Sequence, residues 1–146
     1  MSSLYFSIIF IGLSVIAQAS DKQLEAYIAS FDYAARKEMK IDSAGLIELL
    51  KQDKAQLIDI RFPEEYSAWK VGPSINIPIN ELPENLSRLD KRKIIVTACP
   101  HKDRATIAMV CLRSKGFEVK YLTDGLIGMA ENLRGDAAKS FIEATK

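Results

Sequence analysis

Short apolar runs that alternate with helical segments are the feature that most restricts what this chain can fold into. Four runs, residues 57–60, 75–77, 93–98 and 119–122, are short and mostly apolar, as buried strands are. Helical segments are expected before, between and after them, at residues 43–50, 63–69, 105–112, 127–133 and 137–144. This alternation predicts an α/β domain with a central parallel sheet, helices on both faces, and ligands outside the carboxyl ends of the strands.

The first 19 residues have the pattern of an export signal. Residues 4–17 are mostly apolar and run into Ala17-Gln18-Ala19, an A-x-A cleavage pattern. The apolar run is shorter than the roughly 20 residues that span a bilayer. We expect residues 1–19 to be a signal peptide and the protein to be periplasmic or otherwise exported. Because Met1-Ser2-Ser3 has no Lys or Arg, an uncleaved membrane anchor is the alternative.

Residues 20–39 are expected to form an amphipathic helix ahead of the main domain, which takes residues 40–146. Their apolar side chains recur at intervals of three and four residues, and charged side chains lie off that stripe. The apolar face either packs on its own domain or joins two subunits, so a homodimer through residues 21–39 is one prediction.

Composition excludes some partners. The chain has 20 Lys and Arg against 19 Asp and Glu, so no field of one sign favours nucleic acid or an anionic membrane surface. Any binding of anions must therefore be local. The two cysteines, Cys99 and Cys111, are expected to be free: with a helix from Asp103, Cys111 would lie ~12 Å along its axis, and bridged Cα atoms are seldom more than ~7 Å apart.

The segment 97–105, TACPHKDRA, concentrates reactive chemistry at the end of the clearest strand. A thiol placed there, just before a helix, faces backbone N–H groups and the positive end of the helix dipole. His101, Lys102 and Arg104 add basic side chains beside it. We therefore expect Cys99 to titrate below the usual ~8.5 and to act as a thiolate. Arg104 has the geometry to hold an oxyanion through two parallel hydrogen bonds.

Several segments, taken in order, resemble the rhodanese family over roughly residues 41–134. The matching segments are LIDIR at 57–61, PEEY at 63–66, WKVGPSINIP at 69–78, the strand and loop at 96–105, KGF at 115–117, and residues 121–127. Two positions in the loop depart from the family pattern. Lys102 replaces the common glycine, and Pro100 removes one N–H from the loop.

The resemblance implies a sulfurtransferase. Cys99 and Arg104 have four residues between them, as in sulfur-transferring members, whereas related phosphatases have five. Cys99 is then the catalytic nucleophile, which takes sulfur from thiosulfate or a polysulfide as a persulfide and passes it to a thiol or cyanide-like acceptor. The substrate-binding residues would be Pro100, His101, Lys102, Asp103, Arg104 and Ala105.

Asp59 and Arg61 are expected to support the loop through hydrogen bonds or an ion pair. No metal or cofactor is expected, because Cys99 and His101 alone do not make up the four or so ligands of a zinc site. Three alternatives to a sulfurtransferase stay open: a persulfide carrier that serves a partner protein with little turnover, a phosphatase or arsenate reductase, and a catalytically silent scaffold.

Overall fold

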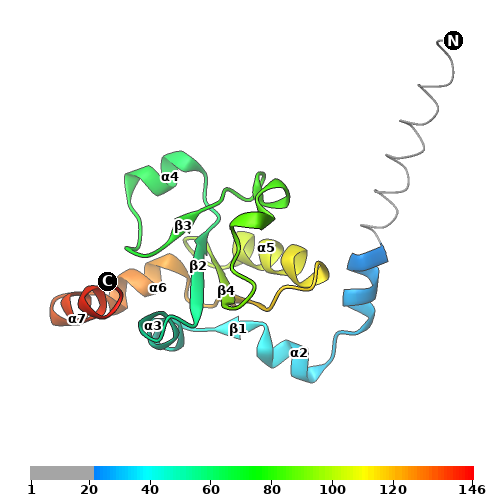
Figure 1. The fold of residues 1–146 in the computed structure, drawn as a ribbon, viewed down its shortest axis with the longest axis horizontal. Coiled ribbons are helices and arrows are strands. Elements are labelled where there is room, and N and C mark those ends of the chain that lie inside the picture. The colour runs from blue at the N-terminus through cyan, green and yellow to red at the C-terminus, as the bar shows by residue number, and fades with distance from the viewer. Residues whose placement is uncertain (1–21) are drawn as a thin grey trace, which may run out of the picture.

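A five-stranded parallel sheet forms the centre of the protein (Figure 1). The computed structural model describes residues 22–146, so the leader predicted for residues 1–19 lies outside the described part. The sheet order is β1-β5-β4-β2-β3, which places β4 in the middle. The strands are β1 (Lys40–Ile41), β2 (Ala55–Asp59), β3 (Ile75–Asn76), β4 (Ile94–Ala98) and β5 (Val119–Leu122).

Helices cover both faces of this sheet, which confirms the predicted α/β class (Figure 1). They are a first helix over residues 22–29, α2 (Tyr33–Glu38), α3 (Ser43–Lys51), α4 (Pro63–Ala68), α5 (Asp103–Ser114), α6 (Gly125–Asn132) and α7 (Asp136–Ala144). Two short 3₁₀ turns, Leu82–Glu84 and Leu86–Arg88, lie between β3 and β4. Among the helices of residues 22–146, none has the length and apolar character to cross a bilayer.

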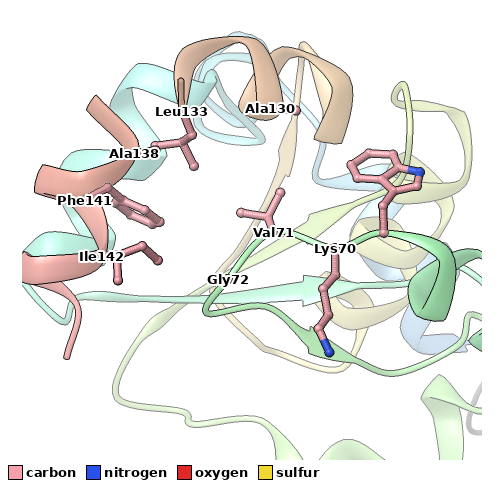
Figure 2. A pocket seen from close by; sticks show the side chains of 9 residues that line it. Lys70, Val71, Gly72, Ala130, Leu133, Ala138, Phe141 and Ile142 are labelled. Atoms are coloured by element: carbon pink, nitrogen blue, oxygen red, sulfur yellow. The ribbon is translucent and has the colours of Figure 1, made fainter. Parts of the chain in front are cut away.

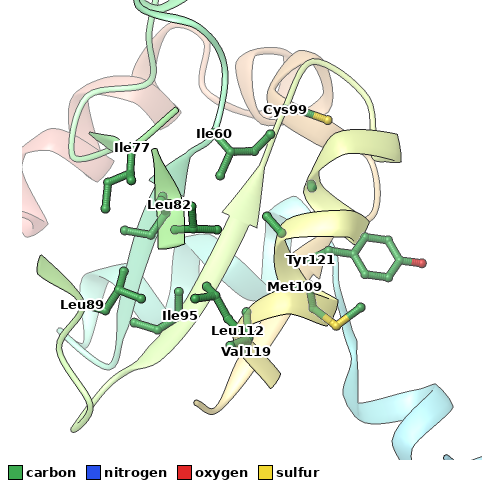
Figure 3. Close-up of a cluster of buried hydrophobic side chains, with 13 residues drawn as sticks. Ile60, Ile77, Leu82, Leu89, Ile95, Cys99, Met109, Leu112, Val119 and Tyr121 are labelled. Carbon is green, nitrogen blue, oxygen red and sulfur yellow. The ribbon is translucent and has the colours of Figure 1, made fainter. Parts of the chain in front are cut away.

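Two apolar clusters hold the layers together, one on each face of the sheet. Ile58 and Ile95 belong to the cluster under α5 (Figure 3), whereas Leu57 and Val96 belong to the cluster under α3, α6 and α7. Successive side chains of a strand point to opposite faces, so β2 and β4 bury both of their faces. This is why apolar residues follow one another directly in both strands, at Leu57-Ile58 and at Ile94-Ile95-Val96, rather than alternating with polar ones.

The N-terminal helical segment is present but is broken, where the sequence predicted one helix over residues 20–39. The first helix ends before Phe31, and α2 starts after Asp32, whose Oδ1 accepts a hydrogen bond from the N–H of Ala35 at 2.8 Å. An aspartate in this position satisfies a free N–H at a helix start and so competes with continuing the preceding helix.

The apolar face of this segment is only partly covered. The hydroxyl of Tyr27 lies 3.9 Å from Met109 Sδ on α5, which joins the first helix to the domain. Ile28 and Tyr33, in contrast, are 56% and 83% exposed. The homodimer through residues 21–39 stays a prediction.

Candidate active site at the end of β4

Cys99 follows β4 directly, at the carboxyl edge of the sheet and next to its middle strand. Residues 100–102 then form a short loop that enters α5 at Asp103. Figure 3 shows Cys99 at the upper end of the apolar cluster, where β4 ends. The cysteine is fully buried at 0% exposure, and both it and Cys111 are free, as predicted.

The turn between β5 and α6 closes on this loop. The N–H of Leu126 donates to the carbonyl of Cys99 at 2.9 Å, and the N–H of Ile127 donates to that of Pro100 at 3.3 Å. Gly125 makes the approach possible: a Cβ there would lie 2.2 Å from the Pro100 oxygen and 2.3 Å from that of His101. Its φ of +66° also favours glycine. Nothing local in the sequence showed that the turn at Asp124-Gly125 packs against the loop of the cysteine.

The other side of the loop is fixed to the sheet. Thr97 is fully buried, and its Oγ1 donates to the carbonyl of Ala105 at 2.8 Å. This bond ties the last part of β4 to the first turn of α5. The cysteine is therefore held between two anchored segments, one on each side.

The electrostatics of Cys99 differ from the prediction. Burial raises the pKa of its thiol above the ordinary value, and the nearby Asp103 carboxylate acts in the same direction. Asp103 Oδ1 lies 3.5 Å from Sγ and accepts a hydrogen bond from it. The backbone N–H groups of Ala105 and His101 favour the anion and oppose the shift. The predicted amide contribution is therefore present, but burial outweighs it, so the net effect favours the thiol over the thiolate.

Arg104 is not open for an anion in this structure. Its Nη1 and Nη2 bind Glu65 of α4 at 2.7 and 2.8 Å, as a bidentate ion pair. These hydrogen bonds hold the pKa of the Glu65 carboxyl at about 2, and they raise the pKa of Arg104 in turn. Glu65 also accepts a hydrogen bond from the N–H of Phe62 at 3.1 Å. Glu65 was missed in the sequence, although it stands in the PEEY segment, because its partner is 39 positions away.

Asp59 and Arg61 form a second, fully buried ion pair. The Arg61 Nη2 atom lies 2.7 Å from Asp59 Oδ2 and donates to the Trp69 carbonyl, also at 2.7 Å. The guanidinium stacks 4.2 Å from the centre of the Trp69 ring. The expected ion pair is thus present, and its further bonds run to the segment after α4 rather than to the cysteine loop.

The remaining loop residues have simpler surroundings. His101 and Lys102 are exposed, Pro100 is half-buried and Ala105 is buried. Lys102 has a φ of −149°, so the loop does not need the glycine that is common at this position. Within residues 22–146, no three His, Cys, Asp or Glu side chains gather as metal ligands would.

A separate cavity of about 240 Å³ lies between the segment after α4 and helices α6 and α7 (Figure 2). Its lining consists of Trp69, Lys70, Val71, Gly72, Ala130, Leu133, Ala138, Phe141 and Ile142. Lys70 is the one titratable side chain in that lining, and no residue of the 99–105 loop contributes to it. The candidate active site is therefore the loop and not this cavity.

Comparison with known proteins decides the family. Residues 43–132, more than half of the chain, match the family described as the rhodanese-like domain. The chain belongs to this family. A Bacillus subtilis protein named "Putative sulfurtransferase" is 28% identical over 89 residues, which cover 60% of this chain and 86% of the relative.

Other relatives place the same domain within longer proteins. An HTH-type transcriptional regulator of Mycobacterium tuberculosis is 32% identical over 117 residues, 78% of this chain, and the chain spans about half (52%) of that relative.

Among solved structures, a Bacillus halodurans protein has a TM-score of 0.62 at 28% identity, covering 74% of this chain and 80% of its own. The thiosulfate sulfurtransferase of Pseudomonas aeruginosa has a TM-score of 0.61 at 22% identity over 76% of this chain and 25% of its own, and it supports the fold alone.

Proposed function

We propose that this rhodanese-like protein is a sulfurtransferase that carries sulfur as a persulfide on Cys99. The observation that carries the proposal is the position of Cys99 at the end of the middle strand, where the N–H groups of His101 and Ala105 favour a sulfur anion. Family membership and the similarity to the Bacillus subtilis protein support the same class of activity.

The proposed reaction has two displacements at sulfur. The Cys99 thiolate attacks the outer sulfur of a donor such as thiosulfate, a new S–S bond forms, and the donor S–S bond breaks with sulfite as leaving group. An acceptor such as cyanide then attacks the outer sulfur of the persulfide, takes it as thiocyanate and returns the Cys99 thiolate. Because the resting state is a thiol, Cys99 must lose its proton before the first displacement, and loading should become faster as pH rises.

Intact-mass spectrometry tests the proposal directly. Protein incubated with thiosulfate or polysulfide should gain the mass of one sulfur atom and lose it when cyanide is added. Cys99→Ser should never gain that mass, whereas Cys111→Ser, which removes the half-buried second thiol, should gain it as the wild type does. Absence of the added sulfur on wild-type protein with both donors, up to alkaline pH, would overturn the proposal.

Turnover with small acceptors separates an enzyme from a persulfide carrier. An enzyme forms many equivalents of thiocyanate per protein, whereas a carrier loads once and then waits for its partner protein. A phosphatase or arsenate reductase is less well supported, because the loop has four residues between Cys99 and Arg104 and because Glu65 occupies the guanidinium. Hydrolysis of an aryl phosphate that is lost in Cys99→Ser would support the phosphatase instead.

The leader supports a proposal about location, namely that the protein acts after export. Residues 1–19 end in an A-x-A pattern, and the alternative of an uncleaved anchor predicts a longer protein held in the membrane. Mass measurement of the protein recovered from the cell envelope distinguishes the two, and the same spectrum reports whether Cys99 carries sulfur.

A further inference from the structure

The side-chain charges around Cys99 differ from the positively charged loop that the sequence predicted. Of the loop's basic side chains, His101 and Lys102 are exposed, while Arg104 is half-buried and acts electrostatically on the Cys99 sulfur. Both outer nitrogens of Arg104 are bound to Glu65 at 2.7 and 2.8 Å. Glu65 therefore neutralises the positive charge of Arg104, which is then not available to an anion at the site.

A second carboxylate lies beside the sulfur. Asp103 Oδ1 is 3.5 Å from Cys99 Sγ and accepts a hydrogen bond from it, and the residue is exposed to solvent. A divalent oxyanion that reaches the sulfur thus meets one carboxylate directly and must compete with Glu65 for the only half-buried guanidinium of the loop. A donor with little or no charge is not repelled by Asp103 and does not need to displace Glu65 from Arg104.

We propose that Glu65 sets the donor selectivity of this site, so that hydropersulfides, R–S–SH, are used in preference to divalent oxyanions such as thiosulfate. The inference rests on the proposed sulfurtransferase function and names the class of donor. Glu65 is a positioning residue in this scheme, because it acts through Arg104 and does not touch the reacting sulfur.

The reaction with this donor is balanced without an added oxidant or reductant. The Cys99 thiolate attacks the terminal sulfur of R–S–SH, and the Sγ–S bond forms as the donor S–S bond breaks. The bonding electron pair leaves with R–S⁻, so one thiolate is consumed and one is produced. No sulfonate has to be accommodated, and Arg104 can keep its bond to Glu65 throughout.

Glu65→Gln is the variant that tests the proposal. The amide retains an oxygen that can accept the N–H of Phe62 and one N–H of Arg104, but it removes the charge that neutralises the guanidinium. We expect kcat/KM for thiosulfate, divided by that for 2-hydroxyethyl hydropersulfide, whose R group is uncharged, to rise about three- to fivefold. Glu65→Asp keeps the charge and should restore a ratio near that of the wild type.

Glu64→Gln is the matched control. It makes the same change of charge one residue away, on an exposed side chain, and should leave the donor ratio unchanged. The double variant Glu65→Gln/Arg104→Gln should lose the gain with thiosulfate, because the gain requires the freed guanidinium. A change in folding alone would lower the rates with both donors together and would not move their ratio.

The outcomes separate this inference from the proposed function. If wild-type Cys99 gains sulfur but Glu65→Gln and Glu64→Gln have the same donor ratio, the selectivity role of Glu65 is wrong and the sulfurtransferase stands. A wild type that prefers thiosulfate over the hydropersulfide also overturns the inference alone. If neither donor transfers sulfur to Cys99, the proposed function fails and this inference fails with it.

Discussion

Two arginine–carboxylate pairs lie in the same half of the molecule and differ in almost every physical respect. Arg61 and Asp59 are two positions apart in the chain, and their side chains are 1% and 0% exposed. Arg104 and Glu65 come from different helices, and their side chains are 28% and 35% exposed. Both pairs are bidentate, so hydrogen-bond geometry alone does not tell them apart.

Burial decides what each pair can do. Removing one partner of a buried pair leaves a charge without compensation, which costs about 3–5 kcal/mol, whereas an exposed pair contributes about 0–1 kcal/mol. The Asp59–Arg61 pair is therefore a permanent part of the framework beneath α4. The Arg104–Glu65 pair can exchange partners with little loss of stability, as the proposed role of Arg104 beside the candidate active site would require.

The largest effect is expected from breaking the buried pair. Asp59→Asn keeps the shape of the side chain but leaves the Arg61 guanidinium uncompensated, and should lower the free energy of unfolding by about 3–5 kcal/mol. Glu65→Gln, the matched change in the half-buried pair, should lower it by less than about 1 kcal/mol. Urea denaturation of both variants measures the difference. Equal losses would show that burial does not distinguish the two pairs.

Substitution of Gly125 tests how tightly the turn before α6 packs against the 99–105 loop. Gly125→Ala places a Cβ 2.2 Å from the Pro100 oxygen, so the loop or the α6 turn must move. We expect a loss of about 2–4 kcal/mol in stability together with altered alkylation of Cys99.

Gly116→Ala is the control for backbone strain alone. Gly116 has a φ of +84°, but a Cβ there would have nothing within 4 Å. It should cost only about 1–2 kcal/mol and leave the reactivity of Cys99 as it is. If both variants changed Cys99 equally, the close approach of Gly125 would not be what shapes the loop.

The smallest effect concerns the charge beside the thiol. Burial and Asp103 both raise the pKa of Cys99, so alkylation by iodoacetamide should keep accelerating as pH rises from about 7 to about 10. Asp103→Asn removes one of these causes, lowers the pKa and should raise the rate near neutral pH about threefold, since a higher fraction is thiolate. The control is Asp136→Asn, the corresponding first residue of α7, which should not change the rate. A rate that fell in Asp103→Asn would contradict the assigned direction.

Much of the framework was predictable from local sequence. The strands at β2 and β4 were recognised because strands buried on both faces carry consecutive apolar residues, here Leu57-Ile58 and Ile94-Ile95-Val96. The position of Cys99 at a strand end followed from the same pattern. The N-terminal helical segment was predicted too, but the structure divides it into two helices at residues 30–32, where Asp32 accepts a hydrogen bond from the N–H of Ala35.

The sequence by itself determined the order of strands and helices, the position of Cys99 at a strand end and its spacing from Arg104, because these depend on neighbours in the chain. Only the tertiary structure decided the charge of the site. It brought Glu65 to Arg104 across 39 positions and placed the Gly125 turn against the loop. The pKa of the thiol depends on burial and on charges within a few ångströms, and those distances exist only after the helices have packed.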